Sequence, residues 1–134
     1  MGVEEFARNV GGELYFDTVY AYNRYAKNRP DREDPWDTVW AFGGNGDGTL
    51  FYPGRPDRIG GTTDVPIDSL RLKHIRDGRQ DFELLRLLDS RGPEGHRRAQ
   101  ALATAMAPRI YGAQRSAAAF ERLRAALFDA LDPR

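Results

Sequence analysis

Aromatic rings, amides and carboxylates recur between residues 17 and 52. Sugar rings stack their CH faces on aromatic side chains, and their hydroxyls hydrogen-bond to planar carboxylates and amides. The residues of these types that could contact a sugar are Asp17, Tyr20, Tyr22, Asn23, Trp36 and Tyr52. We therefore predict that these six residues form the substrate-binding part of a carbohydrate site.

Simpler roles remain open for several of these side chains. Trp36 and Trp40 lie in an aromatic loop, and anchoring that loop by packing is an equally good interpretation, because large aromatic residues mostly pack. Asp17 is as well explained by a structural carboxylate as by a substrate contact. Asp34 and Asp37 are predicted to cap the loop.

Other chemistries lack their residue patterns. The run GGNGDG up to Gly48 is followed by no Lys-Ser or Lys-Thr pair, so a turn is favoured over a phosphate loop or, at Asn45 and Asp47, a calcium loop. His74 and His96 have no metal-ligand spacing and no obvious Asp partner, and no G-x-S-x-G occurs. No two acids are placed as the carboxylate pair that glycoside hydrolysis uses. We predict no catalytic residue, metal or cofactor within this chain.

A group of charged residues surrounds a glycine in the second half of the chain. Arg71, Arg76 and Asp81 flank Gly78 in a helical pattern that the glycine is expected to interrupt. We predict that these charges form an ion-pair cluster that ties the helix to the sheet, which is a structural role.

Composition limits the partners. The chain has 134 residues, which suits a single domain, and a formal net charge of zero, which argues against nucleic acid and anionic membranes. No apolar run reaches the length of a membrane span, and the first residues are acidic where a signal peptide is basic. We expect a soluble protein, while the absence of cysteine leaves its compartment open.

The elements that position these residues change in type near Pro66. Residues 1–65 should form the strand and loop portion, and residues 66–134 the helical portion, of one partial domain over 1–134. The expected elements are a short helix within 3–10, strands over 12–22 and 49–54, a helix capped by Asp68 or Ser69, and helices over 94–107 and 113–131.

This order predicts an α/β fold. Two strands give too little sheet for the helices to cover and leave strand edges exposed. The last units of a parallel barrel have this order, with the chemistry on loops after the strands. We therefore predict the C-terminal fragment of a (β/α)8 TIM-like barrel, with about two strands followed by three helices.

Two long runs carry a family resemblance. FGGNGDGTLFYPG at 42–54 and IGGTTDVPIDSLRLKHIRDGRQDFELLRLL at 59–88 closely resemble the C-terminal part of the glycoside hydrolase family 123 catalytic domain. The stretch GGELYFDTVYAY and the DPW at 34–36 are also similar, so the resemblance covers residues 11–88. Many members of this family are uncharacterised bacterial proteins.

The resemblance implies a barrel hydrolase of N-acetyl-β-galactosaminides or related glycosides, in which the substrate's acetamido group is the nucleophile. In the family an adjacent Asp-Glu pair on an earlier strand assists it, so this chain would lack the catalytic pair and would need the N-terminal part of the barrel as its partner. Two other functions stay open: a carbohydrate-binding module that uses Tyr20, Trp36 and Trp40, and a structural helper that associates through strand edges.

Overall fold

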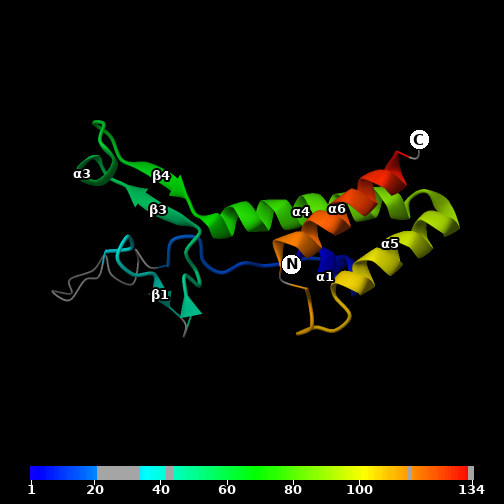
Figure 1. Cartoon of the computed structure of the whole chain (residues 1–134). Helices are drawn as coiled ribbons and strands as arrows, with labels where there is room; N and C mark the ends of the chain where they lie inside the picture. Colours follow the sequence, from blue (N-terminus) through cyan, green and yellow to red (C-terminus); the bar gives the residue numbers. More distant parts are fainter. Residues whose placement is uncertain (21–33, 42–43, 115, 133–134) are drawn as a thin grey trace. The chain divides into compact units, whose positions relative to one another are not determined.

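The computed structural model describes residues 1–20, 34–41, 44–114 and 116–132. The chain folds as two compact units (Figure 1). We call Met1–Glu13 with Ile75–Arg134 the helical unit and Leu14–His74 the hairpin unit. The elements are of mixed α and β type, as predicted, whereas the single partial domain stays a prediction.

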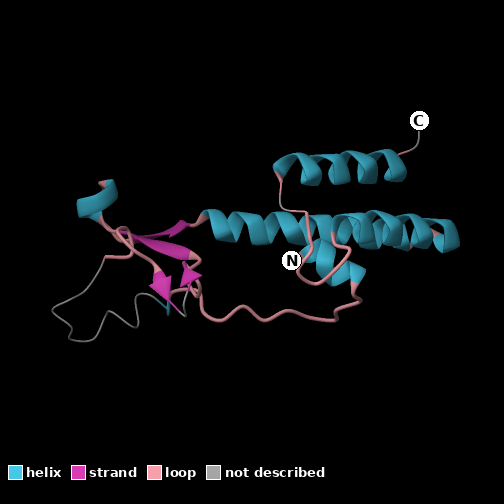
Figure 2. Ribbon diagram, turned by 60° about the horizontal axis from the view of Figure 1, so that its bottom comes forward, coloured by secondary structure: helices cyan, strands magenta, loops and turns pink. Residues whose placement is uncertain are grey.

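The hairpin unit contains two small antiparallel sheets, drawn in magenta in Figure 2. In the first, β1 (Trp40–Ala41) pairs with β2 (Gly44–Asn45). In the second, β3 (Phe51–Gly54) pairs with β4 (Val65–Asp68), so that Tyr52 lies opposite Ile67. The short helix α3 (Pro56–Ile59) lies between β3 and β4 in the chain. The strand predicted over 49–54 is therefore confirmed as β3, whereas no strand was predicted where β4 lies.

The strand predicted over 12–22 is wrong for its described residues, 12–20. Only one isolated bridge forms there, between Val19 and Thr49, and it is antiparallel. It is supported by hydrogen bonds from Leu50 N–H to Thr18 O and from Tyr20 N–H to Gly48 O. The alternating apolar and polar residues over 12–20 therefore belong to a segment whose end, at residues 18–20, lies beside residues 48–50 without joining a regular sheet.

The glycine-rich run forms the expected turn. Gly46 and Gly48 have φ of 90° and 69°, a conformation that costs little only without a Cβ. The turn is closed by a hydrogen bond from Thr49 N–H to Gly46 O. It delivers Thr49 and Leu50, both buried, to the start of β3.

Helix α4 (Leu70–Asp89) begins in the hairpin unit and continues into the helical unit. Its cap is Ser69, whose Oγ accepts a hydrogen bond from Leu72 N–H at 3.2 Å. The predicted interruption at Gly78 is wrong, because the helix runs through this residue without a break. Its backbone instead makes a close contact with α1, and this contact depends on Gly2, because a Cβ on Gly2 would lie 1.8 Å from Gly78 O.

The helical unit surrounds an apolar core. It contains α1 (Gly2–Ala7), the second part of α4, α5 (Gly92–Met106) and α6 (Ala117–Leu131). Both later helices lie close to their predicted positions, and Ser116 caps α6 through its Oγ. The buried core side chains are Val3, Phe6, Leu85, Leu88, Ala99, Ala103, Met106, Ala119, Leu123, Leu127 and Ala130. No helix in the described part of the chain is long and apolar enough to cross a membrane.

Candidate functional site

Two of the predicted sugar-contacting residues meet in the hairpin unit. The rings of Trp36 and Tyr52 lie 5.1 Å apart between centroids, tilted by 34°. Trp36 Nε1 donates a hydrogen bond to Pro53 O at 2.8 Å, which fixes the indole beside β3. The Trp36 residue nevertheless remains 38% exposed. We call Trp36 and Tyr52 the aromatic pair, and it offers solvent an apolar surface with a fixed orientation.

Asp34 holds the loop that carries Trp36. Its Oδ1 accepts a hydrogen bond from Trp36 N–H at 3.0 Å, and its carbonyl oxygen accepts from Asp37 N–H and Thr38 N–H. An aspartate that hydrogen-bonds to the backbone two residues later stabilises such a turn locally. The predicted capping role is confirmed for Asp34.

The other oxygen of Asp34 connects this loop to the segment after β3. Its Oδ2 lies 2.5 Å from Arg55 Nη2 and 3.1 Å from Arg58 Nη2. Burial alone would raise the pKa of Asp34, but the hydrogen bonds from Trp36 N–H, Arg55 and Arg58 outweigh it and hold the pKa below its ordinary value. Sequence analysis missed both arginines, which are 21 and 24 residues from Asp34. The only sequence signal is their spacing of three, typical of one helical face.

Arg71 joins the glycine-rich turn to the aromatic pair. Its Nε donates to Thr49 O at 3.0 Å and its Nη2 donates to Tyr52 Oη at 3.3 Å. The guanidinium packs on Gly46, where a Cβ would lie 2.0 Å from Arg71 Cζ. Arg71 therefore orients the Tyr52 hydroxyl. The Oγ1 of Thr49 is buried and has no hydrogen-bond partner.

The remaining predicted contacts are placed as follows. Asp17 Oδ1 accepts from Thr18 N–H and Val19 N–H, so this carboxylate is engaged in its own turn. The Tyr20 ring lies 6.3 Å from that of Phe16. Tyr22 and Asn23 lie outside the described residues. Of the six predicted residues, the structure thus brings Trp36 and Tyr52 into ring contact.

The ion-pair cluster predicted around Gly78 does not form as one group among the described residues. Arg71 contacts Thr49 and Tyr52 within the hairpin unit, and Arg76 pairs with Asp77 on an exposed part of α4. Asp81 is buried and pairs with Arg124 of α6. Residues close in sequence on a helix point in different directions, so each of the three charges has a different partner.

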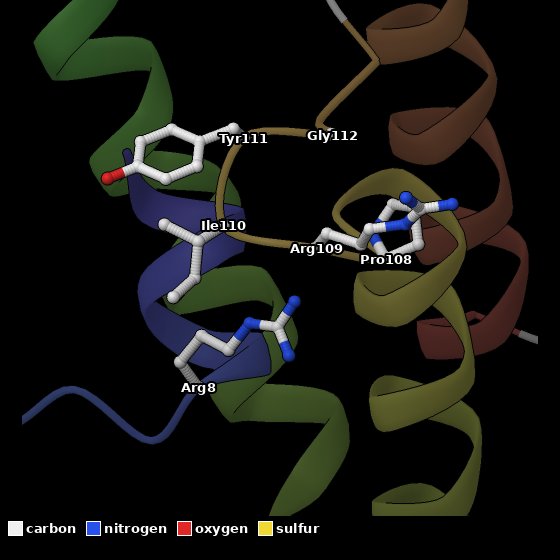
Figure 3. Close-up of a pocket in the computed structure, with 6 residues that line it drawn as sticks. All are labelled: Arg8, Pro108, Arg109, Ile110, Tyr111 and Gly112. Carbon is white, nitrogen blue, oxygen red and sulfur yellow. The ribbon is translucent and has the colours of Figure 1, made fainter.

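Two further features belong to the helical unit. An open depression of about 720 Å³ is lined by the residues labelled in Figure 3, namely Arg8, Pro108, Arg109, Ile110, Tyr111 and Gly112. Separately, His96 Nδ1 lies 2.6 Å from Asp89 Oδ1, so the prediction that neither histidine has an Asp partner is wrong. This pair is exposed, and the nearby hydroxyl of Ser90 donates to Leu87 O.

No protein-family model, curated protein or solved structure matches this chain in comparisons with known proteins. The site is therefore interpreted from its own geometry.

Proposed function

We propose that this chain is the C-terminal, sugar-contacting portion of a glycosidase-like domain. It would contact an N-acetyl-β-galactosaminide or related glycoside through the aromatic pair, with the catalytic Asp-Glu pair supplied from outside the chain. The observation that carries the proposal is the fixed and partly exposed position of Trp36 on Tyr52.

The polar groups around the aromatic pair suit a sugar. Trp36 already uses its N–H, so the indole offers its ring surface for stacking on CH groups. Tyr52 Oη accepts from Arg71, which leaves the hydroxyl proton free to be donated to a sugar oxygen. An apolar ring beside a few oriented polar groups is the usual composition of a small-molecule site.

The barrel-fragment interpretation is supported by apolar surface in the hairpin unit. Leu14, Phe16 and Trp40 are all exposed, and Leu14 is 86% exposed. Sheets of two strands rarely provide a stable fold alone, and exposed apolar patches commonly mark interaction surfaces. We propose that the remainder of a (β/α)8 barrel covers these side chains.

A non-catalytic carbohydrate-binding or scaffold module is the second candidate. It is favoured by the compactness of the hairpin unit, which contains the whole of the aromatic pair and its supporting residues. Expression of residues 1–134 with and without the proposed N-terminal barrel partner distinguishes the two. A gain in sugar affinity or hydrolysis on mixing supports the barrel portion, whereas full affinity of the chain alone supports the module.

The binding test compares two tryptophan variants. N-acetylgalactosamine is titrated into the chain and into Trp36→Ala and Trp40→Ala, with calorimetric detection. We expect weak binding that Trp36→Ala reduces about tenfold, by comparison with nucleobases, whose stacking on an aromatic ring contributes on the order of 1–3 kcal/mol. Trp40→Ala is the matched control and should retain the affinity. Equal affinity of wild type and Trp36→Ala would remove the proposed site.

A second assay tests the absence of catalysis. The purified chain is incubated with an aryl N-acetyl-β-galactosaminide, and release of the phenol is followed. We expect no hydrolysis above buffer, and hydrolysis that disappears on mutation of a residue of this chain would show that the catalytic groups lie within it.

A further inference from the structure

A second cluster of charged groups lies in the helical unit and shares no residue with the aromatic pair or its supporting side chains. Arg79 of α4 contacts two glutamates that are far from it in sequence. Its Nη1 lies 3.5 Å from Glu5 Oε2 of α1, and its Nη2 forms an ion pair with Glu13 Oε2. One guanidinium thus bridges α1 and the residue at which the chain leaves the helical unit.

The two carboxyl groups are largely removed from water. The side chains of Glu5 and Glu13 are 13% and 12% exposed, and Glu13 Oε1 is buried without a hydrogen-bond partner. Burial raises the pKa of Glu5, and the hydrogen bond and charge of Glu13 raise it further, against the opposing effect of Arg79. Two carboxylates that contact one guanidinium carry one negative charge more than it neutralises, so a proton bound by one of them relieves the excess charge.

Other charged groups of the N-terminal segment and of α4 have different partners or act more weakly on Glu5. The amino terminus of Met1 lowers the pKa of Glu5, though by less than Arg79 does. On α1, Arg8 donates to Ala107 O, and Glu4 Oε1 is buried without a partner. On α4, Arg76 pairs with Asp77.

Helix α5, which packs against α1, also carries charged side chains. Arg97 pairs there with Glu94, and His96 with Asp89. The remaining arginine of this helix, Arg98, is exposed. Arg79 is therefore the cation in direct contact with both glutamates.

We propose that Glu5, Glu13 and Arg79 form an acid-stabilised clasp, in which one shared proton lets the two carboxyl groups bind one guanidinium and fasten residues 8–13 to α1 and α4. At acid pH the proton is present and the clasp closes. As pH rises, Glu5 loses this proton, the carboxyl groups carry more negative charge than Arg79 neutralises, and residues 8–13 are released.

The sign of the pH dependence follows from the direction of the Glu5 shift. A group whose folded pKa lies above its unfolded value stabilises the fold fully below the unfolded value, 4.5. That contribution is lost as pH rises through the folded pKa. Stability from this clasp therefore decreases as pH rises from about 4.5, the reverse of the usual behaviour of a paired carboxylate.

The test uses Glu5→Gln in the full chain, because a glutamine amide can donate the hydrogen bond that the shared proton provides. Thermal unfolding is followed from pH 4.5 to pH 8 for wild type, Glu5→Gln and Glu94→Gln. Glu94 is the control, because its side chain is 77% exposed and its partner, Arg97, is also exposed. We expect the unfolding midpoint of Glu5→Gln to exceed that of wild type at pH 8 by a few °C and to match it at pH 4.5.

Glu94→Gln should follow the wild-type curve throughout. A Glu5→Gln curve parallel to wild type, or lower at pH 8, would overturn the proposal. Glu13→Gln is a second variant for which we also expect a higher unfolding midpoint than wild type at pH 8. If one of the two variants fails to fold, the other still tests the proposal. Amide hydrogen exchange of residues 8–13, expressed as protection factors, should fall with rising pH in wild type and change less in Glu5→Gln.

Discussion

Arg124 of α6 donates from Nε to Oδ1 of Asp81 of α4 at 2.6 Å, and the Asp81 side chain is only 1% exposed. Arg124 also donates through Nη2 to Asp77 O at 3.2 Å. The hydrogen bond and charge of Asp81 raise the pKa of Arg124, so the guanidinium stays charged. A buried carboxylate thus depends on one arginine from another helix.

Removal of this arginine should destabilise the helical unit. In Arg124→Ala the Asp81 side chain stays buried without its partner. Loss of one partner from a fully buried pair costs about 3 kcal/mol or more. We expect a smaller loss of stability here, because the Arg124 side chain is partly exposed. Denaturant unfolding of Arg124→Ala and of the exposed control Arg122→Ala measures the difference. Equal stabilities of the two variants would contradict the role of the pair.

The two glycines at the contact of α1 with α4 should respond differently to alanine. At Gly2 the new Cβ would overlap Gly78 O, so Gly2→Ala should cost about 1–3 kcal/mol by overpacking. At Gly78 the nearest atom, Gly2 N, is 3.4 Å away, and alanine is a better helix former by about 0.5–1 kcal/mol. Chemical denaturation should therefore find Gly78→Ala at least as stable as wild type and Gly2→Ala less stable. If Gly2→Ala were the more stable of the two variants, the contact would be refuted.

Gly46 should tolerate alanine less well than Gly60. Both have positive φ, 90° and 80°, so an added Cβ strains the backbone at either position by about 1 kcal/mol or more. Only at Gly46 would the Cβ collide with Arg71, whereas nothing lies within 4 Å of a Cβ at Gly60. We expect Gly46→Ala to lose about 1–3 kcal/mol more stability, by the cost of overpacking, and to weaken sugar binding. Equal losses of stability in Gly46→Ala and Gly60→Ala would show that the Arg71 side chain moves away from the new Cβ at no energetic cost.

Acid should loosen the aromatic pair through Asp34. A carboxyl group whose folded pKa is lowered stabilises the fold above its unfolded value, 3.8, and that stability is lost as pH falls through the folded pKa. In a Trp40→Phe background, Trp36 fluorescence should change below about pH 4 in parallel with loss of the Arg55 and Arg58 contacts. Asp34→Asn should show the low-pH signal at neutral pH, and Asp57→Asn, which removes an exposed carboxylate, should not.

The sequence predicts the helices well because their signals are local. The apolar spacing of Leu123 and Leu127 and the core position of Leu85 follow from a period of 3.6 residues, whereas the start of α6, which Ser116 caps, lies after the predicted start at 113. The strand prediction over 12–22 failed because an alternating pattern shows that a segment is extended but not what pairs with it. The hairpin of β3 and β4 depends on pairing across the 56–64 segment, which has no such alternation.

Half of the aromatic site was predictable from residue type. Trp36 and Tyr52 stand out as residues that stack on sugars, but their contact depends on Asp34, Arg55 and Arg58, which lie far apart in sequence. The same reason hid the partners of Arg79, because Glu5 and Glu13 are far from it in sequence. Ion pairs across elements follow from tertiary packing, and local spacing carries no information about them.

The most direct test of the proposed function is an amide proton-nitrogen correlation spectrum of the chain during titration with N-acetylgalactosamine. The protein has two tryptophans and therefore two indole N–H signals, which Trp36→Phe and Trp40→Phe assign. We expect the Trp36 indole signal and the backbone signals of 51–53 to shift with a common saturation curve while the Trp40 indole signal stays in place. Unchanged Trp36 signals at high sugar concentration would contradict a carbohydrate site at the aromatic pair.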